Sequence, residues 1–157
     1  MNSSCFRRGA YVLGILVAVM TGVALPAAAG PVGFQASIGS NTNSGDFMLG
    51  AGARVGLGPV TVIPNAEWFF VDSGTNYTLN LDGTLSVLSI GLAGIYVGAG
   101  TGVAVVDPDP GDSQEEALLN LMAGVGVNVL MSPFAQMKMV MIDGSDSQYV
   151  ISAGVRF

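Results

Sequence analysis

Four charged residues stand inside alternating apolar and polar stretches of a chain that is otherwise poor in charge: Arg54, Glu67, Lys138 and Arg156. Residues two apart on a strand share a face, and each of these side chains falls on the polar face of its stretch. An enclosed charge is costly without a partner. We therefore predict that the four form a polar cluster inside the fold, in which Glu67 accepts an ion pair from Arg54 or Lys138.

Other chemistry is restricted by what the sequence lacks. The chain has no histidine, which removes the usual general base, the Ser-His triads and most zinc sites. Among the acidic residues we place only Glu67 within a strand body, so it has no second carboxylate for paired acid–base work. We predict no enzymatic activity, no cofactor and no bound metal ion.

Two further patterns resemble binding motifs but have a simpler interpretation. Glycines at 50, 52 and 56, and at 98, 100 and 102, are spaced like phosphate-binding loops but lack the lysine and the following helix. We interpret them as strand glycines that leave room for longer side chains in a narrow interior. The acidic stretch 107–116 lacks the ligand order of a calcium loop, and we interpret it as a solvated loop.

The first 29 residues have the layout of a secretory signal. Arg7 and Arg8 precede the uncharged run 11–25, and Ala27–Ala29 supply a small-residue cleavage site. The alternative is a retained membrane helix, but a span needs roughly 20 apolar residues and this run has 15. We predict a signal peptide at 1–29 and one domain at 30–157. Cys5, the chain's one cysteine, leaves with the signal, so disulfides are not expected.

The remaining composition favours a barrel in a membrane. Charged residues make up 10% of the chain, against about 25% in ordinary soluble domains. After residue 29 there are three cations and eleven acidic residues, a net charge of −8 (3 minus 11), and most of the acids lie in or beside turn-like segments. So few cations give no footprint for nucleic acid. Alternating strands reconcile high hydropathy with the absence of a helix-length apolar run.

Eight strands can be drawn between clusters of turn residues, with boundaries at 33–41, 45–57, 60–72, 83–91, 94–106, 115–131, 134–142 and 147–157. The connections alternate between tight turns and longer, more acidic loops, as in outer-membrane barrels. The apolar phase switches between Val87 and Leu88, which predicts a bulge or a misplaced strand edge. Pro64 predicts a local irregularity because it lacks a ladder donor. In the last strand the odd positions are apolar and the even positions are small or polar, except for the apolar Val150.

Alternation alone does not say which face points outward. A soluble barrel that binds an apolar ligand packs its apolar face inside and carries many Lys and Glu outside, whereas these polar faces carry few charges and many glycines. We therefore predict a transmembrane barrel with the apolar faces in lipid. Aromatic residues near the strand ends fit girdles at the two bilayer interfaces. The predicted girdle consists of Phe34, Phe47, Trp68, Phe70, Tyr149 and Phe157.

The chain resembles the small OmpA-like, opacity-type family of outer-membrane β-barrels. The resemblance rests on the signal, the eight amphipathic runs, the segment Tyr96-Val-Gly-Ala-Gly-Thr-Gly102 and the terminal Val155-Arg156-Phe157. It implies an all-β, eight-stranded antiparallel up-and-down transmembrane barrel in the outer membrane of a Gram-negative bacterium. It also implies outer-membrane lipid as the surroundings, and insertion by a barrel-assembly machinery that recognises Phe157.

Eight strands enclose an interior just wide enough for side chains, so we expect a filled lumen and a structural or surface-interaction role. A narrow, porin-like channel for small solutes is the first alternative, and the soluble ligand-binding barrel is the second. The sequence does not indicate an external partner.

Overall fold

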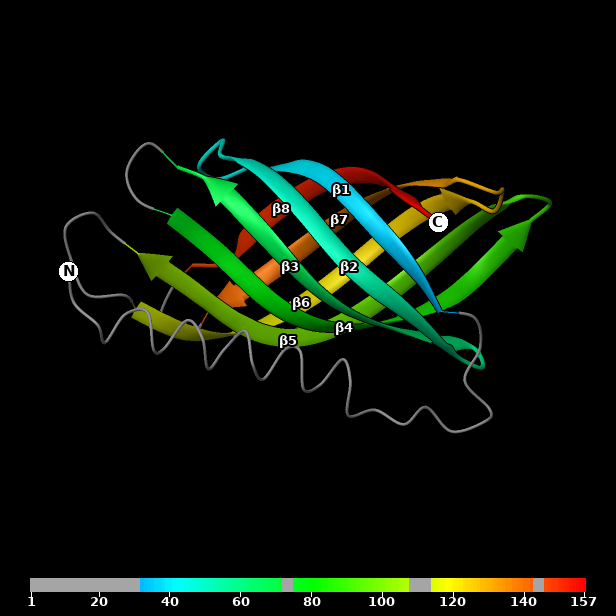
Figure 1. Ribbon diagram of the computed structural model, residues 1–157, viewed down its shortest axis with the longest axis horizontal. Coiled ribbons are helices and arrows are strands. Elements are labelled where there is room, and N and C mark those ends of the chain that lie inside the picture. Colours follow the sequence, from blue (N-terminus) through cyan, green and yellow to red (C-terminus); the bar gives the residue numbers. More distant parts are fainter. Residues whose placement is uncertain (1–31, 72–74, 108–113, 143–145) are drawn as a thin grey trace.

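The computed structural model describes residues 32–71, 75–107, 114–142 and 146–157, and these form one closed sheet of eight antiparallel strands. Each strand pairs with the next along the chain, and β8 pairs with β1 (Figure 1). The all-β, eight-stranded up-and-down barrel predicted from the sequence is confirmed. The strands are β1 (Val32–Asn41), β2 (Phe47–Leu57), β3 (Val60–Phe70), β4 (Thr75–Ile90), β5 (Ala93–Asp107), β6 (Gln114–Val127), β7 (Ser132–Ile142) and β8 (Gln148–Arg156).

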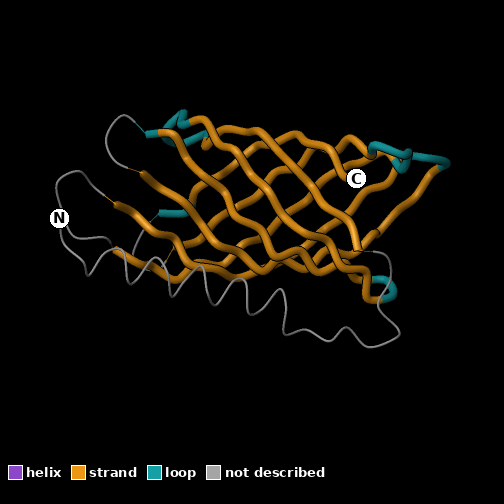
Figure 2. The backbone as a smooth tube through the Cα atoms, in the orientation of Figure 1, coloured by secondary structure: helices purple, strands orange, loops and turns teal. Residues whose placement is uncertain are grey.

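The stagger of the strands sets which residues meet across the barrel. A path of register partners that starts at Val32 returns to the same strand line at Thr42, one residue beyond the end of β1, whose backbone N–H donates to Tyr149 O at 2.7 Å. The shear is therefore ten residues (42 minus 32), which tilts the strands obliquely to the long axis, as Figure 2 shows.

 The successive partners round the closed sheet are thus Val32, Val55, Val62, Gly83, Ala99, Leu121, Met139 and Tyr149.

The two rims of the barrel differ in their connections. Tight turns at 58–59 and 91–92 and the connection 128–131 lie at one end, here called the turn rim, together with Val32 and Phe157 (Figure 2). Gly58 and Gly91 have φ of 63° and 59°, a conformation that glycine adopts without steric cost. The opposite end, here called the loop rim, carries the connection 42–46. The predicted signal peptide, residues 1–29, lies outside the described residues.

Two predicted strand boundaries are wrong by four residues or more. The fourth strand was expected at 83–91, but β4 begins at Thr75, and the sixth was expected to reach residue 131, but β6 ends at Val127. Ser132 and Pro133 were read as a turn and instead begin β7. In β4 the error has a clear cause: its inward face is built from Asn, Thr and Asp, which are also turn residues.

Both predicted irregularities are confirmed. The β4–β5 register shifts between Ser86 and Leu88, so one extra residue is accommodated on β4. The β2–β3 pairing is interrupted between Gly52↔Asn65 and Val55↔Val62, at the position of Pro64. Proline has no N–H to donate to β2 there, although the partner positions on both sides keep the same register.

The outer surface of the barrel is apolar and the inner surface is mixed. Along most of the barrel more exposed and more buried residues alternate, as in the run of β6 where Leu119 and Leu121 are exposed and Leu118 and Asn120 are buried. The exception is the end of β4, where residues 85–90 are all exposed. In a closed barrel the buried set faces the lumen, so the large exposed apolar side chains lie on the outer wall. No helix in the described ranges is long and apolar enough to cross a membrane.

Candidate functional site: the barrel lumen

A buried ion-pair triad lies at mid-height in the lumen. Lys138 of β7 places Nζ 2.6 Å from Glu67 Oε1 of β3 and 3.1 Å from Asp82 Oδ2 of β4. Lys138 is 1% exposed, and both carboxylates are buried. The two short contacts satisfy the ammonium, whereas the triad as a whole retains one excess negative charge.

Amide and hydroxyl side chains extend this triad into a network. Asn65 Nδ2 donates to Asp82 Oδ2 at 2.8 Å, and Asn120 Nδ2 donates to Asp82 Oδ1 at 3.0 Å and to Asn80 Oδ1 at 3.1 Å. Asn80 Nδ2 lies 2.9 Å from Thr78 Oγ1 and 3.1 Å from Asn65 Oδ1. Together with the triad these side chains form what we call the central network: Asn65, Glu67, Thr78, Asn80, Asp82, Asn120 and Lys138.

Glycines on β5 make room for the central network. A Cβ added to Gly100 would overlap the Asp82 carboxylate, and one added to Gly102 would lie 2.6 Å from Asn80 Oδ1. The backbone of β5 therefore forms a bare wall against which the polar groups of β4 pack. This agrees with the interpretation of these glycines as lumen spacers.

The structure divides the four charged residues of the predicted cluster into two groups. Glu67 and Lys138 meet, but Arg54 does not reach Glu67, because the register partner of Glu67 on β2 is Gly50. Arg54 lies four residues nearer the turn rim, about 13 Å along the strand at roughly 3.3 Å per residue. Arg156, on β8, lies near Arg54, and the two positive charges repel each other.

Arg156 is held by aromatic rings rather than by a carboxylate. Its guanidinium carbon lies 4.5 Å from the centroid of Tyr96 and 4.3 Å from the centroid of Phe134. Tyr96 also donates through its hydroxyl to Gln136 Oε1 at 3.1 Å. Among the described residues neither arginine forms an ion pair, and Nε of both is buried without a hydrogen-bond acceptor.

On the other side of the central network, toward the loop rim, the lumen is apolar. Met48, Leu118, Val140 and Val150 pack together with Ala104, and Phe69 and Ile142 pack against them. Val150 is the apolar exception among the even positions of the last strand. It faces the lumen and packs against apolar side chains there. Its side chain is 1% exposed.

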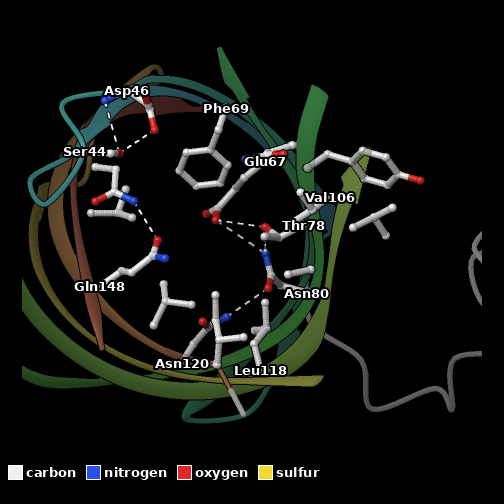
Figure 3. A pocket seen from close by; sticks show the side chains of 18 of the residues that line it. Ser44, Asp46, Glu67, Phe69, Thr78, Asn80, Val106, Leu118, Asn120 and Gln148 are labelled. Carbon is white, nitrogen blue, oxygen red and sulfur yellow. Dashed lines mark hydrogen bonds between the residues drawn. The ribbon is translucent and has the colours of Figure 1, made fainter. Parts of the chain in front are cut away.

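A cavity of about 300 Å³ opens in this part of the lumen (Figure 3). Its walls include Phe69, Leu118 and Val140, and its polar side is formed by Glu67, Thr78, Asn80 and Asn120 of the central network. Asn41 and Gln148 line it nearer the loop rim, where Asn41 Nδ2 donates to Gln148 Oε1 at 2.7 Å. Ser44 and Asp46, which hydrogen-bond to each other, also contribute to the lining.

The six aromatic residues of the predicted girdle all lie on the outer wall and are exposed. Phe47 and Phe70 contact each other on β2 and β3 at the loop rim, with ring centroids 5.7 Å apart. Phe34 and Phe157 do so at the turn rim, with centroids 6.4 Å apart. Trp68 and Tyr149 complete the set.

Asp82 is the lumen residue that the sequence analysis missed. It was counted among the turn acids, and the statement that Glu67 is the one acid in a strand body is wrong. The signal that could have located it is the alternation of Tyr77, Leu79, Leu81 and Leu85 with polar residues at even positions. Within the described ranges no group of three or more acidic, histidine or cysteine residues could hold a metal ion.

Fold and lumen together define the class of a small outer-membrane-type β-barrel. The chain is similar to neisserial surface protein A, with 16% identity and a TM-score of 0.65 over 82% of this chain and 97% of that one. It is also similar to the N-terminal barrel domain of Pseudomonas aeruginosa OprF, with 14% identity and a TM-score of 0.66 over 83% of this chain and 98% of that one. A de novo designed barrel, TMB2.3, matches with 16% identity and a TM-score of 0.54 over 85% of this chain and 97% of that one.

At these identities the likeness shows the fold. No family model matches the sequence, and no curated protein matches it.

Proposed function

We propose that this protein is a structural or surface-interacting barrel of the Gram-negative outer membrane, with a blocked lumen and no catalytic role. The observation that carries the proposal is the burial of the central network. Its charged members, Glu67, Asp82 and Lys138, are each less than 5% exposed to solvent. A lumen whose mid-height side chains are this inaccessible offers no continuous path for ions.

The outer wall supports a location in lipid. Large apolar side chains are exposed on all eight strands, mostly leucine, isoleucine, valine and aromatic residues and, on β7, Met137; such a surface would cause a soluble protein to aggregate. At mid-height Glu67, Asp82 and Lys138 point inward, where the lysine escapes the cost of roughly 2–4 kcal/mol for a cation facing the middle of a bilayer. Glu115, near the loop-rim end of β6, is exposed. This arrangement argues against the soluble barrel with an apolar ligand in its interior.

The absence of catalysis is supported by how the lumen groups are used. Both carboxylates of the triad are paired with Lys138, and this ion pairing disfavours their use as a base. The chain has no histidine to replace them.

Single-channel recording in planar bilayers tests the proposal. We expect the purified full chain to give no stepwise conductance at 1 M KCl, while a known large porin gives steps in the same membranes. Reproducible small steps would instead establish the narrow channel. Membrane fractionation with a heat-shift gel tests the location: the protein should pellet with outer membranes and change mobility on boiling.

A further inference from the structure

On the side formed by the central network, the cavity on the loop side of the lumen has an imbalance of hydrogen-bonding groups. The donors of the central network that border it are all in use: both Asn120 and Asn80 amides and the Thr78 hydroxyl donate within the network. Unused capacity lies in the acceptors. Asn120 is 1% exposed, and its Oδ1 has no hydrogen-bond donor within the described part of the chain.

The orientation of this amide is fixed by its partners. Rotation of the Asn120 amide by 180° would put its oxygen against Asn80 Oδ1 and Asp82 Oδ1, two acceptors that now receive hydrogen bonds at 3.1 Å and 3.0 Å. The oxygen must therefore face away from them. An acceptor left unsatisfied in a buried position costs about 1–3 kcal/mol, so the site calls for a donor.

A second acceptor on the same side of the cavity is only weakly engaged. Glu67 Oε1 is held by Lys138 at 2.6 Å, but Oε2 receives just two long contacts, from Thr78 at 3.4 Å and from Asn80 at 3.5 Å. Normal hydrogen bonds to an oxygen are several tenths of an ångström shorter. Since the triad carries two carboxylates against one ammonium, a positively charged donor would also neutralise the excess charge.

Apolar side chains form part of the remaining walls, beside polar residues near the loop rim, and they set the apolar part of the ligand. The apolar lining consists of Phe69, Leu118, Val140, Ile142 and Val150, of which Phe69 and Leu118 lie two residues from the acceptors Glu67 and Asn120 on the same strands. A volume of about 300 Å³ is at the lower end of the range for small-molecule sites.

From this geometry we infer a binding site for a small alkyl- or arylalkylammonium compound. Its ammonium group donates to Glu67 Oε2 and Asn120 Oδ1, and its apolar body packs against Leu118, Val140 and Phe69. This goes beyond the structural role proposed above and does not depend on whether the lumen conducts ions.

Butylammonium is a suitable probe, because it is soluble in water and partitions little into lipid. The full chain in nanodiscs of zwitterionic lipid is titrated with butylammonium chloride, and the side-chain amide resonances of Asn80 and Asn120 are followed by NMR. We expect saturable shifts at millimolar concentrations. Butanol and butyrate, which match the apolar body but lack the ammonium, should bind at least tenfold more weakly.

Two neighbouring residues on opposite faces of β6 give a matched pair of variants. Leu118→Phe fills the cavity and should weaken butylammonium binding at least tenfold, whereas Leu119→Phe alters the lipid-facing wall and should bind as the parent does. If Leu118→Phe does not fold, Ala104→Val reduces the same cavity by a smaller amount.

Three results would overturn the inference. One is the absence of saturable shifts up to 100 mM butylammonium, which would mean that water alone occupies the cavity. Another is equal binding of butanol and butylammonium, which would show that the acceptors play no part. The third is unchanged binding by the cavity-filling variants.

Discussion

Lys138 of β7 and Asp82 of β4 meet in the middle of the barrel, with Nζ 3.1 Å from Oδ2, although the two residues lie 56 positions apart in the chain. Glu67 approaches the same ammonium from β3. One lysine thus ties together strands that share no backbone hydrogen bonds with its own. The stability of the barrel should depend more on this cation than on either carboxylate.

Replacement of Lys138 by Met should therefore be the most damaging change in the triad. It leaves Glu67 and Asp82 buried without a counter-charge, and breaking a buried pair in this way costs about 3–5 kcal/mol. Glu67→Gln should cost less, because Lys138 keeps Asp82 as a partner. Urea unfolding of the detergent-solubilised barrel, followed by heat-shift gel, measures the order.

The triple variant Lys138→Met, Glu67→Gln, Asp82→Asn is the control for this prediction. It has no buried charge in the central network and should recover most of the loss. Equal urea midpoints for the parent and Lys138→Met would reject a structural role for the triad.

Gly100→Ala should also destabilise the barrel, by about 1–3 kcal/mol, because the new methyl group overlaps the Asp82 carboxylate. Ala99→Val, one residue away on the outer face of β5, adds more volume without a clash and serves as the control. The same unfolding assay applies. A loss in the control as large as that in Gly100→Ala would show that β5 is sensitive to any added side chain.

The two arginines of the turn side should respond in opposite ways. Arg156→Met removes contacts with Tyr96 and Phe134 and should lower the free energy of unfolding by about 0.5–2 kcal/mol. Arg54→Met removes a positive charge that repels Arg156, and it removes a buried Nε that has no hydrogen-bond acceptor. The free energy of unfolding of this variant should therefore be unchanged or higher. A large loss for Arg54→Met would mean that this side chain has a binding partner.

Trp68, the chain's single tryptophan, reports which face meets lipid. Its side chain is 43% exposed on the outer wall. In bilayers we expect its fluorescence to be quenched by brominated lipid and to be insensitive to aqueous iodide. The reverse pattern would place the outer wall in water and support the soluble barrel.

Phe157 gives a test of assembly in cells. The resemblance to outer-membrane barrels predicts that Phe157→Ala lowers the amount of protein inserted in the outer membrane. Phe34→Ala is the matched control, since it removes the other ring of the same contact at the turn rim. Equal insertion of all three proteins would show that the terminal aromatic is not recognised.

The number of strands and the direction of each face could be predicted because both follow from alternation and turn chemistry. The partner of Glu67 could not be fixed in the same way. Arg54 can be excluded by the hairpin at 58–59, which places Gly50 opposite Glu67. Lys138 lies on a strand that is far away in the chain, and its approach depends on the shear of ten residues, a property of the whole ring of pairings.

Asp82 was missed for a different reason. An Asp-Gly pair is a strong turn signal when it stands between apolar runs. In β4 the same pair lies mid-strand: Asp82 binds Lys138 and Asn120, and Gly83 lies on the outer face. The inward face of a lumen-lining strand and a surface turn use the same polar residues, so composition alone does not separate them.

The seam between β1 and β8 joins the first strand of the barrel to the last. As long as β8 is unpaired, β1 and β7 each present a row of backbone N–H and C=O groups that hydrocarbon cannot satisfy. The pairing of β8 with both β1 and β7 removes both of these edges at once. Folding in a bilayer must then be a concerted event, and every partly assembled form needs shelter from both lipid and other chains.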